Sequence, residues 1–171
     1  MSDQKQLHRD TIWPVRAFAC PVCNAFTPFE AARCAECGAS LGLHLPTKSM
    51  VALDGDAARV DGQRWIRCTQ SVTLGCNWLV PDEESDAYQR GRCLSDSLIR
   101  REPDAADTPA REKLVPTAAA LRRLVYQLVD IGLPVEPFWQ RQNGLAFDLL
   151  SSYSEEQRVT IGHANGVITI D

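Results

Sequence analysis

The chain has 171 residues, of which 44% are hydrophobic, and this composition excludes a disordered chain and fits one medium domain or two small ones. The formal net charge of −4 gives no electrostatic reason to expect nucleic acid as a partner. The sequence has seven cysteines and no apolar leader segment in residues 1–10, which predicts thiols that bind metal in a reducing compartment. It has no apolar run long enough to cross a membrane, so we expect a cytoplasmic protein.

The first predicted unit is a zinc ribbon over residues 17–41, built on two C-x2-C pairs ten residues apart. The four cysteines are Cys20, Cys23, Cys34 and Cys37. Asn24 and Gly38 follow the pairs, and both residue types tolerate the positive φ of a tight turn. Four thiolates suit Zn²⁺ and leave no open position for water, so we predict a structural zinc ion; iron is the alternative that the ligands alone leave open.

Residues 42–98 are predicted to form a β-rich segment. A short strand is expected around 50–53 and another over 63–68, with a turn at Asp61-Gly62 between apolar pieces. Residues 75–81 form a further strand-like piece that a proline closes.

A second group of cysteines in this segment indicates another metal site. Cys93-Leu-Ser-Asp96 has the spacing of a C-x2-C pair with a carboxylate in place of the second thiolate, and Asp oxygen is an acceptable zinc ligand. The hypothetical site consists of Cys68, Cys76, Cys93 and Asp96. The alternative is that the three thiols pack as small hydrophobic side chains without metal. The sequence thus predicts one structural Zn²⁺ and leaves a second ion open.

Residues 99–116 contain few apolar side chains and are predicted to be a linker between two structural units. Thr117 is the expected N-cap of a helix whose apolar residues recur with helical spacing. These residues are Leu121, Leu124, Val125, Leu128 and Val129. Arg122 and Arg123 are expected on the solvated face of the helix, with a basic contact to a partner as the alternative.

The remainder of residues 117–171 is predicted to be β structure, which makes the fold class α+β. Residues 145–150 form a short apolar run, and two further strands, 159–163 and 167–171, are joined through Asn165-Gly166, a strong hairpin signal. No later element follows the last strand, so this sheet is expected to be incomplete.

No catalytic motif is present in the sequence. The three histidines, His8, His44 and His163, are far apart, and there is no H-E-x-x-H, Gly-rich phosphate loop or G-x-S-x-G. His163 is expected to be a surface or cross-strand residue, because a lone titratable group needs a partner to form a site. We therefore predict no catalytic and no cofactor-binding residue apart from the metal ligands.

Several stretches, in order along most of the chain, resemble a bacterial family of zinc-ribbon proteins that are described as zinc-binding metallopeptidases. Besides the two C-x2-C pairs, they are Gly75-Cys-Asn-Trp-Leu-Val-Pro81, Leu121-Arg-Arg-Leu-Val-Tyr-Gln-Leu128, Gly132-Leu-Pro-Val135, Gly144-Leu-Ala-Phe-Asp148 and Gly162-His-Ala-Asn-Gly-Val-Ile-Thr-Ile170. The resemblance implies that residues 117–171 begin a zincin-like α+β domain whose H-E-x-x-H helix lies downstream. It also implies a C-x2-C pair where this chain has Asp96, so the second site stays open.

The expected function is that of a zinc-binding protein: the N-terminal portion of a metallopeptidase, with no catalytic activity of its own. The alternative is a stand-alone zinc-ribbon module that binds a protein or peptide through an exposed sheet edge. Nucleic-acid binding by the ribbon would have only Arg16 and Arg33 for phosphate contacts.

Overall fold

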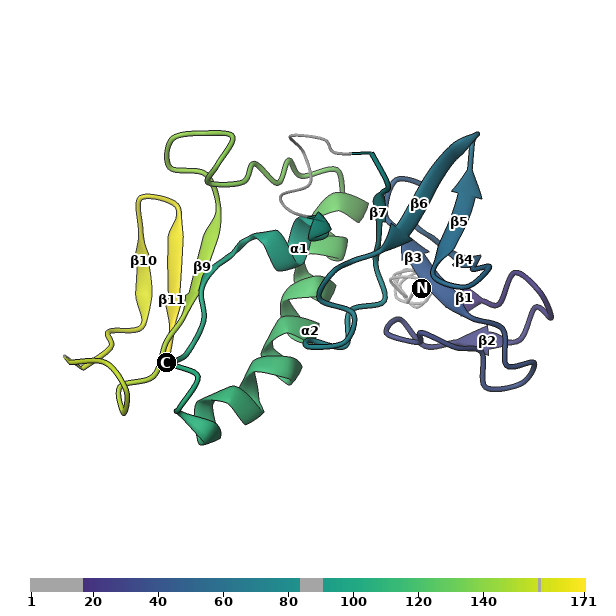
Figure 1. Ribbon diagram of the computed structural model, residues 1–171. Helices are drawn as coiled ribbons and strands as arrows, with labels where there is room; N and C mark the ends of the chain where they lie inside the picture. Colours follow the sequence, from purple (N-terminus) through teal and green to yellow (C-terminus); the bar gives the residue numbers. More distant parts are fainter. Residues whose placement is uncertain (1–16, 84–90, 157) are drawn as a thin grey trace, which may run out of the picture.

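The computed structural model describes residues 17–83, 91–156 and 158–171, so His8 lies outside the described residues. Figure 1 shows small β-sheets from the N-terminal half at one end of the molecule and the C-terminal sheet at the other, with helix α2 between them. Both helices and sheets are present, so the predicted α+β class is confirmed.

The N-terminal half consists of three small antiparallel sheets. Their strands are β1 (Phe18–Ala19) with β2 (Phe26–Thr27), β3 (Leu41–His44) with β4 (Ser49–Ala52), and β5 (Ala57–Val60) with β6 (Gln63–Arg67) and β7 (Leu79–Pro81). The strands expected around 50–53 and 63–68 are β4 and β6, whereas β3 and β5 are additional. Asp61 (φ 52°) and Gly62 (φ 82°) both have positive φ, as a two-residue turn between β5 and β6 requires.

The C-terminal half places one long helix beside a four-stranded mixed sheet. Its elements are α1 (Leu94–Ser97), β8 (Ile99–Arg101), α2 (Thr108–Asp130), β9 (Ala146–Leu149), β10 (Gly162–Ala164) and β11 (Val167–Ile170). The strand order is β10-β11-β9-β8; β11 and β8 run parallel to β9, and β10 is antiparallel to β11. The hairpin prediction is confirmed, with Asn165 (φ 50°) and Gly166 (φ 82°) in its turn.

Gly166 is a position where only glycine fits. A Cβ there would lie 2.1 Å from the carbonyl oxygen of Asn143, and the backbone already has positive φ. We expect Gly166→Ala to lower the free energy of unfolding by about 2 kcal/mol or more, because strain and a clash with backbone add. Urea unfolding measures the loss. Gly162→Ala in the neighbouring strand, where an added Cβ meets nothing within 4 Å, is the control, and equal losses in both variants would contradict the prediction.

Helix α2 begins at Thr108, so the prediction of Thr117 as its N-cap is wrong. The side chain of Asp107 caps the helix instead, with Oδ1 accepting from the Ala110 N–H at 3.1 Å. Pro116 lies inside the helix and does not break it, although it lacks an N–H donor. The region predicted as a linker therefore contains β8 and the first turns of α2; the division into domains stays a prediction.

One hydrophobic core joins the two halves of the chain. It contains Phe18 from the ribbon, Trp78 from the β-rich segment, Leu121 and Val125 from α2 and Phe147 from β9. Phe29 also packs against this core, with its ring 5.1 Å from that of Tyr126 and 6.4 Å from that of Trp78. The ribbon is thus held against α2 by aromatic packing and not by a flexible tether.

Candidate metal centres

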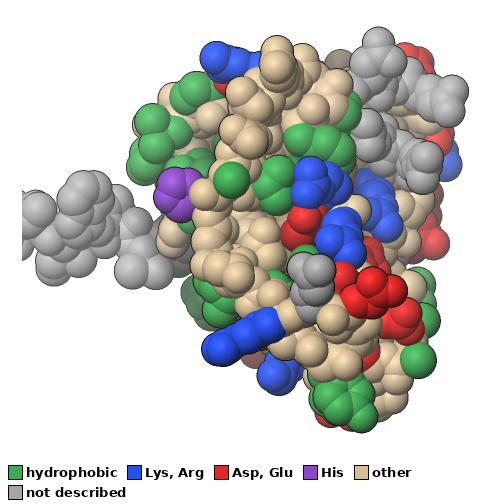
Figure 2. Space-filling model, turned by 90° about the vertical axis from the view of Figure 1, so that its left-hand side faces the viewer, with side chains coloured by type: hydrophobic (Ala, Val, Ile, Leu, Met, Phe, Trp, Pro, Cys, Tyr) green, Lys and Arg blue, Asp and Glu red, His purple; other side chains and the backbone are tan. Residues whose placement is uncertain are grey.

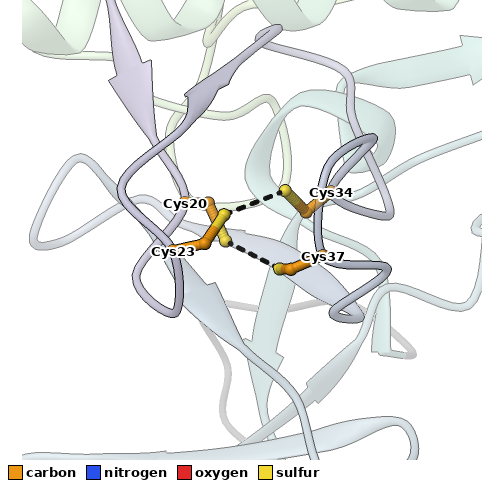
Figure 3. A group of neighbouring side chains, drawn as sticks. All are labelled: Cys20, Cys23, Cys34 and Cys37. Carbon is orange, nitrogen blue, oxygen red and sulfur yellow. Dashed lines mark hydrogen bonds between the residues drawn. The ribbon is translucent and has the colours of Figure 1, made fainter.

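The first candidate site lies between the two turns that carry the C-x2-C pairs. It comprises Cys20, Cys23, Cys34 and Cys37, whose sulfur atoms face one another in Figure 3. Cys20 Sγ lies 3.7 Å from Cys37 Sγ, and Cys23 Sγ lies 3.6 Å from Cys34 Sγ. Zinc–sulfur bonds of 2.3 Å place the corners of a tetrahedron about 3.8 Å apart, so these separations suit Zn²⁺.

The same local hydrogen bonds form both turns. The N–H of Cys20 donates to Ala25 O at 2.8 Å, and the N–H of Cys34 donates to Ala39 O at 2.9 Å. The expected positive φ is present at Asn24 (61°) and at Gly38 (72°). Each turn thereby points its sulfur atoms toward those of the other turn (Figure 3).

Backbone N–H groups also donate hydrogen bonds to sulfur atoms of this site. The Val22 N–H donates to Cys20 Sγ at 3.4 Å. A hydrogen bond from the Cys37 backbone lowers the pKa of Cys34 to about 7. Such bonds favour the thiolate, the form that binds metal.

The second candidate site is buried between the β-rich segment and the two helices. Cys68 follows β6, Cys76 precedes β7, Cys93 caps α1, and Asp96 lies within α1. All four side chains are buried, and their ligand atoms lie within 4.8 Å of one another. Cys76 Sγ is 3.7 Å from Cys93 Sγ, and Cys68 Sγ is 3.4 Å from Asp96 Oδ2. The structure thus brings together all four residues of the hypothetical site.

The spacing Cys93-x2-Asp96 produces a local turn around sulfur. Cys93 is the N-cap of α1, and its Sγ accepts from the Asp96 N–H at 3.5 Å. Cys68 Sγ accepts from the Cys93 N–H at 3.2 Å and from the Gln70 N–H at 3.4 Å. The turn places a thiol and a carboxylate on the same side of the short helix, as a C-x2-C pair places two thiols.

The charge balance of the second site favours a bound cation. Hydrogen bonds from the thiols of Cys76 and Cys93, with the two N–H donors, lower the pKa of Cys68 to about 2. Burial raises the pKa of Cys93 and of the Asp96 carboxyl, and the Cys68 thiolate raises that of Asp96 further. Burial thus disfavours the anionic forms of these ligands, and a bound cation would offset that cost. Three sulfur donors and one oxygen donor are a set that Zn²⁺ accepts.

Arg122 is a residue of the second site that the sequence prediction missed. It was expected on the solvated face of α2, but its side chain is only 1% exposed and forms an ion pair with Asp96, 2.9 Å from Nη1 to Oδ1. Its Nη2 donates to Leu74 O at 3.0 Å. The expectation is wrong for Arg122 because a buried carboxylate attracts it; Arg123, the next residue, is exposed and pairs with Glu30. Arg122 lies four residues after Ala118 and three before Val125, both buried in the core, and this helical spacing was the available signal.

The two described histidines lie outside both sites. His44 in β3 is buried, with Nδ1 2.7 Å from Thr47 Oγ1 and its ring 4.2 Å from that of Trp65. His163 is exposed in β10 and faces Ile168 of β11 in the sheet register, as expected.

On the face shown in Figure 2, basic and acidic side chains lie next to one another.

Two protein families match the chain in succession. Residues 17–107 match a zinc-ribbon domain family, and residues 111–171 match a family described as "Putative zinc-binding metallo-peptidase". The two matches meet at the start of α2, within the region predicted as a linker.

Among the relatives are uncharacterized proteins of Mycobacterium tuberculosis H37Rv and of Mycobacterium bovis. Each is 36% identical over 158 residues, which is 92% of this chain and 43% of the relative. The chain therefore spans less than half the length of these curated relatives. No solved structure matches the chain. Within the described residues, no helix has the length and apolar character needed to cross a membrane.

Proposed function

The chain belongs to the zinc-ribbon domain family matched over residues 17–107, and from this premise we propose that it is a structural module that binds two zinc ions. The observation that carries the proposal is the presence of two groups of four donor atoms, each group within 4.8 Å. Zinc at both sites would supply cross-links between loops, since four protein ligands leave no open position for water or substrate.

Each site would connect segments that have little secondary structure of their own. Site 1, defined as Cys20, Cys23, Cys34 and Cys37, joins the turn after β1 to the turn that precedes β3. Site 2, defined as Cys68, Cys76, Cys93 and Asp96, joins the end of β6, the loop before β7 and α1. The metal would thereby contribute folding free energy to the N-terminal half.

The module would support a metallopeptidase-like protein without hydrolysing peptides itself. The match over residues 111–171 supports the relation to that family. A zincin-type centre needs two histidines one turn apart with a glutamate, and the sequence contains no H-E-x-x-H. All seven cysteines lie in the two candidate metal sites, a use of cysteine typical of a reducing compartment, which we infer to be the cytoplasm.

Metal analysis tests the proposal. The purified chain is expected to contain two zinc ions and no stoichiometric iron by elemental analysis, and Cys76→Ser is expected to reduce the content to one zinc ion, because it removes one ligand of site 2 alone. Ser71→Ala, a substitution of a neighbouring non-ligand residue, is the control and should retain both ions. One zinc ion in the unmodified chain, unchanged by Cys76→Ser, would overturn the assignment of site 2.

A further inference from the structure

We propose that Arg122 is the positioning residue of site 2: it orients Asp96 as the fourth zinc ligand and so connects metal binding to the placement of α2. This inference rests on the second zinc ion of the proposed function. It concerns a side chain that is itself no ligand, and that comes from a part of the chain outside the zinc-ribbon match.

The two oxygens of Asp96 face different partners. Oδ1 accepts a hydrogen bond from Arg122 Nη1 at 2.9 Å, whereas Oδ2 lies 3.4 Å from Cys68 Sγ on the side of the three sulfur atoms. Zinc bonds of about 2.1 Å to oxygen and 2.3 Å to sulfur place those two atoms about 3.6 Å apart in a tetrahedron. The ion pair therefore leaves one oxygen available in a position that suits a metal ligand.

The guanidinium group also holds a second loop of the site. Arg122 Nη2 donates to the carbonyl of Leu74, which is buried and lies two residues before Cys76. One side chain of α2 thus contacts both the helix that carries Asp96 and the loop that carries Cys76. Ligand orientation by such outer partners commonly determines the affinity of a metal site.

The charge of the zinc-bound site also favours the ion pair between Arg122 and Asp96. Three thiolates and one carboxylate around Zn²⁺ leave a net charge of −2, in a position where Asp96 is 0% and Arg122 1% exposed. A buried ion group is tolerated only when it is paired and hydrogen-bonded, and the arginine offsets one of the two negative charges. Occupied site 2 and α2 therefore stabilise each other, across the boundary between the two family matches.

A comparison of two backgrounds tests the role of Arg122. Arg122→Met is introduced into the unmodified chain and into Asp96→Cys, and the zinc affinity of site 2 is measured by competition with a chelator. We expect a 10- to 100-fold loss in the unmodified chain, as for other residues that orient a ligand. In Asp96→Cys the loss should be at least about threefold smaller, because a fourth thiolate needs no guanidinium to orient it and only the charge offset is lost. Arg123→Met, an exposed neighbour on the same helix, should change neither value.

Cobalt substitution gives a readout that a purely structural role would not move. In the unmodified chain, Arg122→Met should shift the visible absorption bands of Co²⁺ at site 2, because the carboxylate is no longer held on the metal; in Asp96→Cys the bands should stay in place. If Arg122→Met does not fold, Arg122→Lys keeps the charge without the planar fork and takes its place in the same comparison.

The possible failures are distinguishable. Equal loss of affinity in both backgrounds, with unchanged cobalt spectra, would overturn the positioning role of Arg122 and leave the second zinc ion intact. An unmodified chain that holds a single metal ion would overturn the proposed function and this inference with it.

Discussion

Removal of zinc is expected to unfold the ribbon formed by residues 17–41. Its strands β1 and β2 have two residues each, and the buried cluster inside it comprises only Cys20, Cys34 and Leu41, two of which are ligands. Even with Phe18 and Phe29 packed against the larger core beside α2, such a small inner cluster cannot offset the loss of chain entropy. The metal therefore supplies the missing free energy, on the order of 10 kcal/mol or more for structural zinc sites.

Amide hydrogen exchange is the measurement that locates this effect. After chelation, the amides of Cys20 and Cys34, which donate to Ala25 O and Ala39 O, should lose their protection, and added zinc should restore it. Cys37→Ser should give the same result without chelator. Glu36→Gln, a substitution of an exposed residue in the same turn, should leave protection unchanged. Persistent protection in the metal-free protein would show that packing alone maintains the ribbon.

The elements that the sequence predicted correctly are those determined by local spacing and turn residues. The two C-x2-C pairs need only their own turns to face one another, and Asn165-Gly166 determines a hairpin within a few residues. Cys93 and Asp96 likewise lie on one side of α1 because of their spacing. That Cys68 and Cys76 join them was a hypothesis from residue type, and the structure now places all four together.

The features that were missed depend on competition between signals or on contacts distant in sequence. Pro116 is a strong sign of a helix boundary, yet the cap at Asp107 and the packing of Leu114 and Ala118 in the core extend the helix through it. The contact between Arg122 and Asp96 joins two elements whose relative placement no local pattern specifies. The grouping of these four side chains was therefore predictable from the sequence, but the arginine that contacts Asp96 was not.

Trp78→Ala is expected to cause the largest loss of stability among single core substitutions outside the metal ligands, about 3–5 kcal/mol in the free energy of unfolding. Trp78 is 1% exposed and lies in the core that joins both halves of the chain. Its ring meets that of Phe29 edge-on, and its carbonyl accepts from the Cys68 N–H at 3.0 Å. The neighbouring Asn77 donates to Phe29 O at 2.8 Å, so this short stretch fixes the ribbon to the β-rich segment.

The expected loss of stability in Trp78→Ala has two causes: the large cavity that truncation leaves, and the contacts of the residues around that cavity. Truncation removes one of the ring partners of Phe29 and leaves space close to Cys76. The backbone there is held by hydrogen bonds and cannot easily collapse into the space. Unfolding should be measured with zinc in excess, so that metal loss does not add to the result. Trp78→Phe retains most of the ring volume and should lose clearly less. Trp139→Ala removes the same side chain from a partly exposed position, and a loss there equal to that of Trp78→Ala would show that Trp78 has no special role in joining the two halves.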